Sequence, residues 1–380
     1  MNSNGPAMLD DSHYRIADSS LIFSPALVLF REILDENLDE MIRIAGHPSR
    51  LRPHSKTHKM AAITKIELAK GIVKHKAATF AEAEMLAEAG AKDVCLAYNP
   101  VGPNVRRAVE FVSKFPGVVF IVTADDPNQV AELGKAMEAA GRTVGVLLDL
   151  DVGQHRTGIA IGEPAARLYQ QIATTRGLRA EGFHAYDGHV HQPSLDERNE
   201  SVTGIWPALR AFRDSLVREG LTVPRIVAGG TPSFSLYARI DDPSVELSPG
   251  TCVLNDAGYT NAYRDLKFQP AAVLFTRVVS RPTADRVTVD LGTKSVATDS
   301  PVGVRVVFPA IPDAVHVAHN EEHLVLQTSR AADFKPGDEL FGVPRHVCPT
   351  VALHKDVPVI SDGKLIDRWE VTARDRRLTI

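Results

Sequence analysis

The stretch LRPHSKTHKM, residues 51–60, decides how the rest of the chain is interpreted. It places two imidazoles, His54 and His58, beside two amines, Lys56 and Lys59. A lysine shifts its pKa readily when it is desolvated or lies near other cations, and it can then serve as a Schiff-base nucleophile. Helix-like stretches precede and follow the segment, so we expect a strand and the turn after it. A catalytic group at the C-terminal end of a barrel strand would be placed in this way, although spacing alone leaves a basic, solvated turn open.

The composition describes an ordinary globular chain. Its 380 residues are enough for a barrel and a second domain, with 44% hydrophobic and 24% charged residues. A net charge of −4 gives no electrostatic reason to expect nucleic acid or an anionic membrane as a partner. No apolar run is long enough to span a bilayer, and the N-terminus lacks the apolar core of a signal peptide. The widely spaced Cys95, Cys252 and Cys348 argue against a disulfide framework and favour a reducing cytoplasm.

Strand-like and helix-like segments alternate through the first two thirds of the chain. The segment VGVLLDLD, residues 144–151, is nearly all apolar, as expected for a strand buried on both faces of a parallel sheet. AEAEMLAEAG is a strong helix former that ends at Gly90. The strand count is near eight, and no G-x-G-x-x-G fingerprint follows a predicted strand. We therefore predict an α/β fold, a (β/α)8 TIM-like barrel rather than an open doubly wound sheet.

The pattern changes near Ala271, where strands separated by turn residues begin and helix becomes rare. SDGK, residues 361–364, is a turn signal between two of these strands. The strand near Ala26 could belong to either half, so the first boundary is open. The predicted parts are an N-terminal leader that could join the β domain (1–25), a barrel (26–270) and a C-terminal β-rich domain (271–380).

The string RPHSKTHK resembles the lysine motif of the D-threonine aldolase and D-serine dehydratase family, which are pyridoxal-phosphate (PLP) enzymes of the alanine-racemase fold type. In that family the first lysine of the KTHK run holds the cofactor, which corresponds to Lys56 here. His54, in the same string, is placed with the cofactor-binding residues. Family-like strings extend from about Leu51 to Trp369, so the resemblance covers nearly the whole chain. It implies a barrel followed by a β domain, with PLP bound in the barrel.

Two glycine turns, AGGTPSF and LSPGTCV, are candidates for binding the cofactor phosphate. Glycine lets backbone amides approach the phosphate oxygens, and hydroxyl groups add donors. A helix starting after Pro232 would direct its positive end at the anion. Ordinary βα turns are the alternative, but the ends of late barrel strands are where a barrel phosphate site usually lies. The predicted phosphate residues are Gly230, Thr231, Ser233, Gly250 and Thr251.

Two further strings carry predicted contacts to the cofactor ring. QHRTG, residues 154–158, resembles a family string that lies at the cofactor. Arg156 within it could contact the ring face or bind the substrate carboxylate bidentately; a solvent-exposed ion pair is the alternative. Tyr186 in HAYDGH resembles the tyrosine that the family places near the pyridine nitrogen, where a neutral hydroxyl would make the ring a weaker electron sink. Without the resemblance, a tyrosine in a strand is more often a core residue.

The metal prediction rests on His346 and Cys348 in the string RHVCPT. Two residues apart in a strand, both side chains would point to one face. Imidazole and thiolate suit Zn²⁺, with Mn²⁺, Co²⁺ and Mg²⁺ as alternatives. Spacing alone favours a chance pair, because zinc cages usually show four ligands. The resemblance reverses this, since the family binds a divalent ion through a histidine and, two residues on, an Asp or a Cys.

His189 and His191 lie after a predicted strand, in YDGHVHQ, and either could act as a general base near neutral pH. The aldolase branch of the family uses a histidine in this region, while a satisfied loop histidine is the alternative for at least one of the two. DLGTK and NEEH, at residues 290–294 and 320–323, also resemble family strings. They could close the site from the same chain or from a partner subunit, which is a reason to expect a homodimer.

The resemblance implies a cytoplasmic PLP- and metal-dependent lyase whose partner is a small D-3-hydroxy amino acid. PTVALH and the two extra histidines favour retro-aldol cleavage to glycine and an aldehyde. Cys348 favours instead a dehydratase that releases ammonia and a 2-oxo acid from D-serine or D-3-hydroxyaspartate. An amino-acid racemase and a non-catalytic PLP-binding protein are the remaining alternatives. The residues after Ala271 and the histidine–cysteine pair count against the non-catalytic protein.

Overall fold

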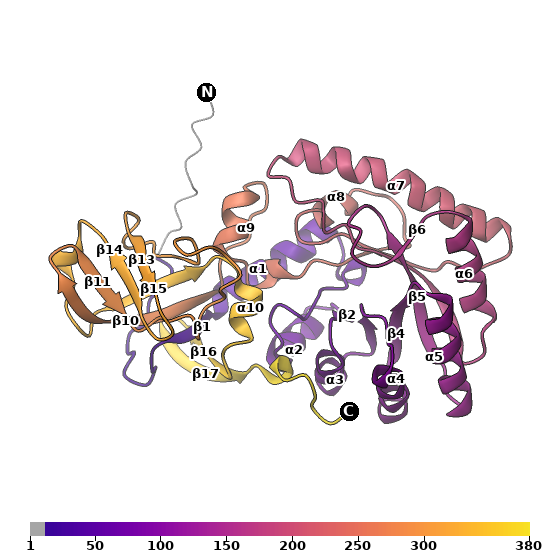
Figure 1. The fold of residues 1–380 in the computed structure, drawn as a ribbon, viewed down its shortest axis with the longest axis horizontal. Helices are drawn as coiled ribbons and strands as arrows, with labels where there is room; N and C mark the ends of the chain where they lie inside the picture. The colour runs from indigo at the N-terminus through magenta and orange to yellow at the C-terminus, as the bar shows by residue number, and fades with distance from the viewer. Residues whose placement is uncertain (1–11) are drawn as a thin grey trace. The chain divides into compact units, whose positions relative to one another are not determined.

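The computed structural model describes residues 12–380, so the first part of the predicted leader, residues 1–11, lies outside the described residues (Figure 1). The chain divides into two compact units. The first, called here the barrel unit, comprises residues 42–56, 61–250 and 375–380. The second, the β unit, comprises residues 12–41, 57–60 and 251–374. Helix α1 (Arg31–Ala45) runs from one into the other.

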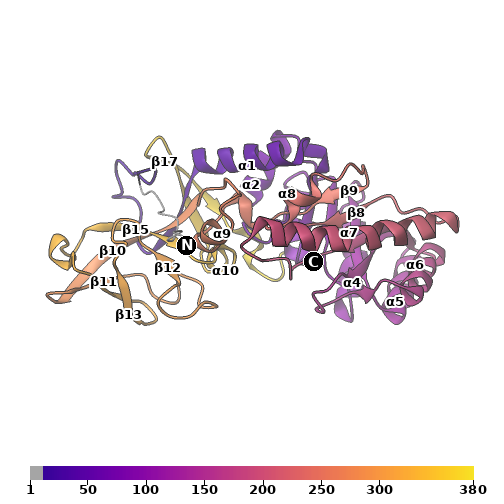
Figure 2. The same ribbon diagram turned by 90° about the horizontal axis from the view of Figure 1, so that it is seen from above.

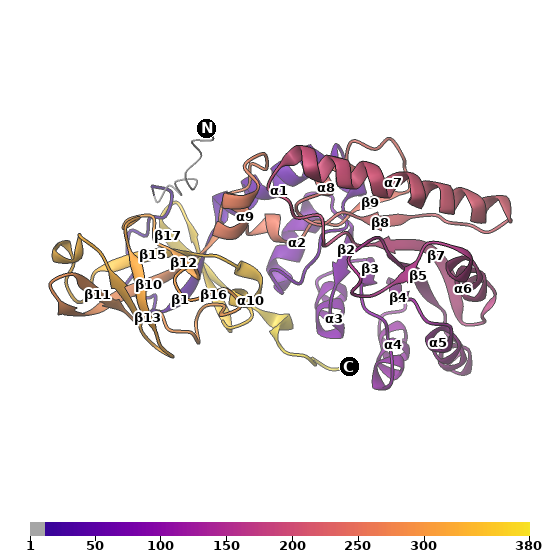
Figure 3. The ribbon, with the colours of Figure 1, turned by 45° about the horizontal axis from the view of Figure 1, so that its top comes forward.

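Seven parallel strands of the barrel unit are hydrogen-bonded in chain order. They are β2 (Lys74–Ala77), β3 (Asp93–Leu96), β4 (Val119–Ala124), β5 (Val144–Asp151), β7 (Leu178–Ala185), β8 (Ile226–Ala228) and β9 (Val245–Leu247), with the two-residue β6 (Ile159–Ala160) beside β5. The alternating helices are η1 (Pro48–Arg50), α2 (Ala61–Ala69), α3 (Phe80–Glu88), α4 (Pro103–Lys114), α5 (Pro127–Ala139), α6 (Glu163–Thr174), α7 (Leu195–Arg218) and α8 (Phe234–Tyr237). Helices α3 to α6 lie on the outer side of the strands, and α7 runs beside β8 and β9 (Figure 2 and Figure 3).

Residues 51–54, at the start of the LRPHSKTHKM stretch, lie between β9 and β2 and close the barrel. Leu51 forms a parallel bridge with Leu247 of β9, and His54 forms one with Lys76 of β2. The Lys76 N–H also donates to the Pro53 carbonyl over 2.8 Å. Residues 51–54 therefore take the place of the eighth strand between β9 and β2. The predicted barrel is confirmed, although residues 51–54 form isolated bridges rather than a regular strand.

Arg52 anchors the closing segment from inside the barrel. Its fully buried guanidinium donates to Glu246 Oε2 over 2.6 Å and to Asp93 Oδ1 over 2.8 Å. Burial opposes the charge on Arg52, but the two carboxylates outweigh burial and raise its pKa. Burial likewise raises the pKa of Glu246, but the cations around it, Arg52 first, outweigh that effect and lower it to about 2. Each charge is tolerated because its partner is present.

The β unit is built on a mostly antiparallel sheet. Its strands are β1 (Ala26–Phe30), β10 (Ala272–Thr283), β11 (Arg286–Val289), β12 (Val306–Val307), β13 (Val315–His319), β14 (Leu324–Gln327), β15 (Glu339–Pro344), β16 (Asp356–Ser361) and β17 (Lys364–Glu370). Its short helices are η2 (Thr251–Val253), α9 (Ala257–Ala262), η3 (Ala331–Asp333), α10 (Val347–Val351) and η4 (Thr372–Arg374). The predicted turn at residues 361–364 joins β16 to β17, with Asp362 and Gly363 at positive φ.

The observed units differ from the expected boundaries at residues 26 and 270. Strand β1 pairs antiparallel with β10 and parallel with β16, so it belongs to the sheet of the β unit. The β unit also begins at Thr251 rather than at Ala271. Both differences reflect pairing between residues far apart in sequence, which the alternation of strands and helices does not reveal. Among residues 12–380, no helix is both long enough and apolar enough to cross a membrane.

We predict that Arg52→Ala destabilises the protein by about 3–5 kcal/mol, because it removes the fully buried cation that Glu246 and the half-buried Asp93 share. Urea unfolding of the purified chain measures the change. Arg106→Ala is the control, since the Arg106 side chain is 77% exposed and only pairs with Glu110 on the surface of α4. A loss of stability no larger for Arg52→Ala than for Arg106→Ala would contradict the anchoring role.

Candidate functional site

Lys56 lies directly after the segment that closes the barrel. It is half-buried, and its backbone N–H lies 3.4 Å from His54 Nδ1. The preceding Ser55 N–H donates to the Lys76 carbonyl over 2.9 Å, so β2 holds the chain up to the residue before the lysine. The predicted cofactor lysine thus occupies the strand-end position that the sequence implied, and His54 lies within the same turn.

Tyr186 is the centre of a group of polar side chains in the barrel unit, called here the barrel cluster. It follows the last residue of β7, and two cations face its ring. The Arg156 guanidinium lies 4.9 Å from the ring centroid, and the Lys76 amine lies 5.6 Å from it. The structure therefore brings together two of the predicted ring contacts, Arg156 and Tyr186. The barrel cluster consists of Lys76, Asp149, Arg156, His184 and Tyr186.

Sequence reasoning missed three members of the barrel cluster. His184 Nδ1 lies 2.7 Å from Asp149 Oδ1, and its Nε2 lies 3.5 Å from Lys76 Nζ. Burial lowers the pKa of His184. Burial alone would raise the pKa of Asp149, but His184 outweighs it and lowers that pKa. A charged residue within an otherwise apolar buried strand was the available signal, because such residues are rarely buried without a partner or a function.

The first glycine turn has backbone donors held in place by side chains. The Gly230 N–H donates to Asp187 Oδ1 over 3.2 Å, and the Gly250 N–H donates to Thr231 Oγ1 over 3.2 Å. A Cβ added to Gly230 would lie 3.2 Å from Tyr186 Cε2, so the turn packs closely against the tyrosine ring. The Ser248 hydroxyl is buried without a hydrogen-bond partner. The Gly230 and Gly250 amides already donate within the protein, so the unpartnered Ser248 hydroxyl and the remaining amides of the turns are the groups that fit the phosphate of PLP.

The expected helix after Pro232 needs correction. Helix α8 does begin after the turn, at Phe234, but it has only four residues. A single turn adds little macrodipole, so amides and hydroxyls are the remaining phosphate donors. Ser233 is buried, and its hydroxyl lies 3.5 Å from the Gly230 carbonyl. Thr251 belongs to the β unit, where its hydroxyl lies 3.6 Å from Cys348 Sγ.

The two candidate bases differ in their surroundings. His189 is half-buried, and its Nδ1 is enclosed without a hydrogen-bond partner. It packs against Gly153, where an added Cβ would lie 2.9 Å from His189 Nε2. His191 is exposed. An enclosed imidazole with an unsatisfied nitrogen is the better candidate for proton transfer, so the structure favours His189 over His191.

His346 and Cys348 do not lie on a strand, which corrects the predicted geometry. His346 is the N-cap of α10, and Cys348 lies in its first turn. The Val347 N–H donates to Asp256 Oδ2 over 3.0 Å, which fixes the start of the helix. The two side chains still interact. Burial opposes the charge on His346, but hydrogen bonds with Cys348 and Asp299 outweigh burial and raise its pKa to about 9.

The surroundings of this pair fit a divalent metal with open positions. Asp299 Oδ2 lies 2.5 Å from His346 Nδ1, which leaves Nε2 as the ligating nitrogen, as in carboxylate–histidine–metal arrangements. The Thr57 hydroxyl lies 3.3 Å from Cys348 Sγ. No group of three or more His, Cys, Asp or Glu side chains is positioned to hold a metal ion among residues 12–380. A closed four-ligand cage is therefore absent from that range, and His346 and Cys348 are two candidate ligands for an ion that would keep open positions.

The two other family-like strings of the β unit contact each other. The Thr293 N–H donates to the Asn320 carbonyl over 2.8 Å, and Lys294 pairs with Glu321 over 2.8 Å. A Cβ on Gly292 would lie 1.9 Å from the Glu321 carbonyl oxygen, so only glycine fits there. The strings DLGTK and NEEH thus form one structural element of the β unit.

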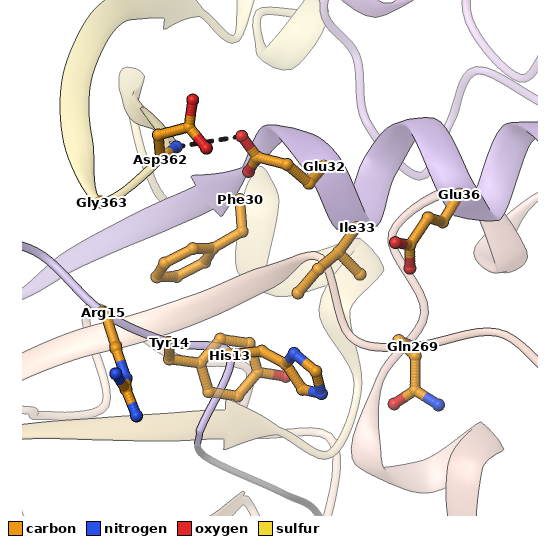
Figure 4. A pocket seen from close by; sticks show the side chains of 10 residues that line it. All are labelled: His13, Tyr14, Arg15, Phe30, Glu32, Ile33, Glu36, Gln269, Asp362 and Gly363. Atoms are coloured by element: carbon orange, nitrogen blue, oxygen red, sulfur yellow. Dashed lines mark hydrogen bonds between the residues drawn. The ribbon is translucent and has the colours of Figure 1, made fainter.

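The cavity shown in Figure 4 lies elsewhere in the β unit. Its volume is about 300 Å³, and it lies between residues 13–15, the start of α1 and the β16–β17 turn. On one side of the cavity, the Glu32 carboxylate accepts a hydrogen bond from the Asp362 N–H over 3.0 Å. None of the residues that line this cavity is a predicted catalytic, cofactor or metal residue.

Comparison with known proteins identifies the family. Residues 31–256 match the family described as "Alanine racemase, N-terminal domain", and residues 271–360 match the "Putative serine dehydratase domain". The D-threonine aldolase of Arthrobacter sp is 31% identical over 92% of this chain and 92% of its own. The chain belongs to the alanine-racemase-like family of D-threonine aldolases and D-serine dehydratases.

Other members of the family match over a similar length. The crystal structure of D-threonine aldolase from Filomicrobium marinum has a TM-score of 0.85 and 30% identity, covering 93% of this chain and 95% of that one. The 3-hydroxy-D-aspartate aldolase of Paracoccus denitrificans (strain Pd 1222) is 28% identical over 94% of both chains. The D-threo-3-hydroxyaspartate dehydratase from Delftia sp. HT23 shares the fold, with a TM-score of 0.79 and 22% identity over 92% of this chain and 97% of that one. As a member of this family, the chain is an enzyme, a PLP-dependent lyase.

We predict that Asp187→Ala loosens the glycine turn. Burial raises the pKa of Asp187, and its carboxyl accepts the Gly230 N–H, so its loss leaves a buried amide unpaired. The expected cost is about 1–3 kcal/mol, with faster hydrogen exchange at Gly230. Exchange measured by NMR or mass spectrometry tests this, with Asp196→Ala in the exposed first turn of α7 as the control. Unchanged exchange at Gly230 would contradict the assigned role of Asp187.

Proposed function

We propose that this chain is a D-3-hydroxy amino acid lyase that cleaves the Cα–Cβ bond by a retro-aldol reaction, releasing glycine and an aldehyde. Three relatives that match more than nine tenths of the chain are aldolases, one acting on D-threonine and two on 3-hydroxy-D-aspartate. The observation that carries the proposal is the position of Lys56, at the end of the segment that closes the barrel, beside a cluster that fits a PLP ring.

In this proposal the residues of the barrel unit bind and orient the cofactor. Lys56 holds it, and the turn around Gly230 and Thr231 binds its phosphate through amides and hydroxyls. The Tyr186 hydroxyl supports the pyridine side, while the Arg156 guanidinium faces the ring or the substrate carboxylate. PLP, when bound, withdraws electrons from the substrate carbon attached to the amino group.

The proton transfers fall to this chain's side chains. His189 is positioned to remove the proton of the substrate 3-hydroxyl, because its imidazole is enclosed and one nitrogen is unsatisfied. His346 and Cys348 would hold a divalent ion, which when bound acidifies that hydroxyl. Zinc suits this pair of ligands best, with manganese, cobalt and magnesium as alternatives.

A specific observation favours a dehydratase as the second candidate. The second predicted metal ligand is a cysteine, and a metal-free form of the D-threo-3-hydroxyaspartate dehydratase carries a cysteine-to-alanine substitution. Another solved form of that protein carries a histidine-to-alanine substitution two positions earlier. If Lys56 removes the Cα proton and the 3-hydroxyl leaves, the products are ammonia and a 2-oxo acid. The homodimer and the cytoplasmic location remain predictions from the sequence.

Product analysis tests the proposed reaction. The purified chain with PLP and Zn²⁺ or Mn²⁺ should convert D-threonine to glycine and acetaldehyde and should leave L-threonine unchanged, because the lysine acts on one face of the substrate. D-Serine and D-3-hydroxyaspartate complete the panel. Ammonia with a 2-oxo acid would establish the dehydratase instead. Equal consumption of both threonine enantiomers would contradict the stereochemistry and favour a racemase.

We predict that a chelator abolishes activity while the melting temperature changes little. An ion with two protein ligands serves catalysis, whereas the binding energy of a structural zinc is folding energy. His346→Ala should reproduce the chelator effect. Cys348→Asp should keep an ion but shift the preference from zinc towards manganese, because a carboxylate replaces a thiolate. Full activity of metal-free protein in excess chelator would rule out the metal-assisted reaction.

A further inference from the structure

Lys76 is a buried amine to which the sequence analysis gave no role. It lies on β2, next to the segment that leads to Lys56, and only 3% of the residue is exposed. Its Nζ lies 3.5 Å from His184 Nε2 and 5.6 Å from the centre of the Tyr186 ring. A lysine is almost never buried to this degree without a partner or a function. Within residues 12–380, the hydrogen-bond partner of Nζ is the His184 imidazole, which carries no negative charge to balance the amine.

Asp149 determines which nitrogen of the His184 imidazole carries the proton. Its Oδ1 lies 2.7 Å from His184 Nδ1, so Nδ1 carries the proton and Nε2 accepts a hydrogen bond from Lys76. Burial lowers the pKa of His184, which keeps the ring neutral near pH 7. Of the three groups Asp149, His184 and Lys76, the Lys76 amine is therefore the one whose charge changes near neutral pH.

The surroundings of Lys76 favour its neutral, deprotonated form. Burial is the largest influence and, with a smaller contribution from Lys56 on the segment before α2, it lowers the pKa of Lys76 to about 7. Cys95 of β3, Asp149 of β5 and Asp187 after β7 act in the opposite direction. The Tyr186 ring also faces the amine, and the Arg156 guanidinium faces the same ring. Burial thus disfavours the charged form of this amine in the free protein.

We propose that Lys76 is a positioning residue whose positive charge strengthens the binding of the anionic, phosphate-bearing cofactor in the barrel unit. The inference rests on the proposed function, in which Lys56 and the barrel cluster bind PLP. A bound anion favours the charged form of a neighbouring amine, so binding raises the pKa of Lys76. Between its pKa in the free protein and its higher pKa in the complex, binding takes up a proton. The affinity then falls by about tenfold for each unit of rising pH.

The test uses pyridoxine 5′-phosphate, which has the ring and phosphate of PLP but no aldehyde and so forms no bond with Lys56. Calorimetry between pH 7 and 9, in two buffers of different ionisation enthalpy, gives the affinity and the protons taken up. The wild-type affinity should fall by about tenfold per pH unit above pH 7, with uptake approaching one proton. In Lys76→Met the affinity should be lower at pH 7 and should lose this slope and this uptake.

Two further variants separate the role of Lys76 from a purely structural one. Lys76→Arg carries a permanent charge, so it should bind tightly with neither the slope nor the proton uptake, even if Lys76→Met folds poorly. Lys74→Met is the matched control, because Lys74 lies two residues earlier on β2 and pairs with Glu246 at 2.9 Å. It should retain the wild-type slope and uptake.

The outcomes distinguish this inference from the proposed function. If Lys76→Met or Lys76→Arg keeps the wild-type slope and proton uptake, the role of Lys76 is overturned while PLP binding stands. If the wild-type protein binds neither pyridoxine 5′-phosphate nor PLP at any pH, the proposed function and the inference both fail. If the pH slope of the affinity and the proton uptake are lost only in the Lys76 variants, the inference and the proposed function are both supported.

Discussion

The buried guanidinium of Arg52 is the constraint on which the barrel unit depends. It joins the closing segment to Glu246 of β9 and to Asp93 of β3. The segment is too short to be held by a regular ladder of backbone hydrogen bonds, and Pro53 within it donates none. Backbone hydrogen bonds from the Arg52 and His54 N–H groups to the Leu247 and Pro249 carbonyls hold one edge of the segment, and the paired charges of Arg52 add to them. The next residues of the same segment, up to Lys56, are therefore held at the end of a strand rather than in a mobile loop.

The chemistry of the barrel unit follows from that placement. Once residues 51–54 lie beside β2, Lys56 and Lys76 are on neighbouring segments, and His184 and Tyr186 approach from β7. Strand ends from different parts of the chain thus contribute to one group of side chains, as in other barrel enzymes. Lys56 and the barrel cluster together carry two amines: Lys56 is proposed to bond to the cofactor, and Lys76 is proposed to adjust the affinity for it.

The sequence predicted the features that are local and missed those that depend on distant partners. The lysine motif, the near-eightfold alternation and the turn at 361–364 are local, and they predicted the barrel and the β-rich second half. Strand β1 was harder to assign, because its place is set by pairing with β10 and β16. The helix at Val347 was predicted as a strand, although Pro349 argues against a regular strand. The interaction of Lys76, Asp149 and His184 could not be predicted, because their contact exists only after the barrel closes.

The central claim is that Lys56, placed by the closing segment, carries PLP. Borohydride reduction of the full-length protein loaded with PLP, followed by peptide mass spectrometry, tests it most directly. We expect one reduced cofactor adduct, on the peptide that contains Lys56, and none in Lys56→Ala. An adduct on Lys59 or Lys76 in the wild-type protein, or no adduct at all, would contradict it.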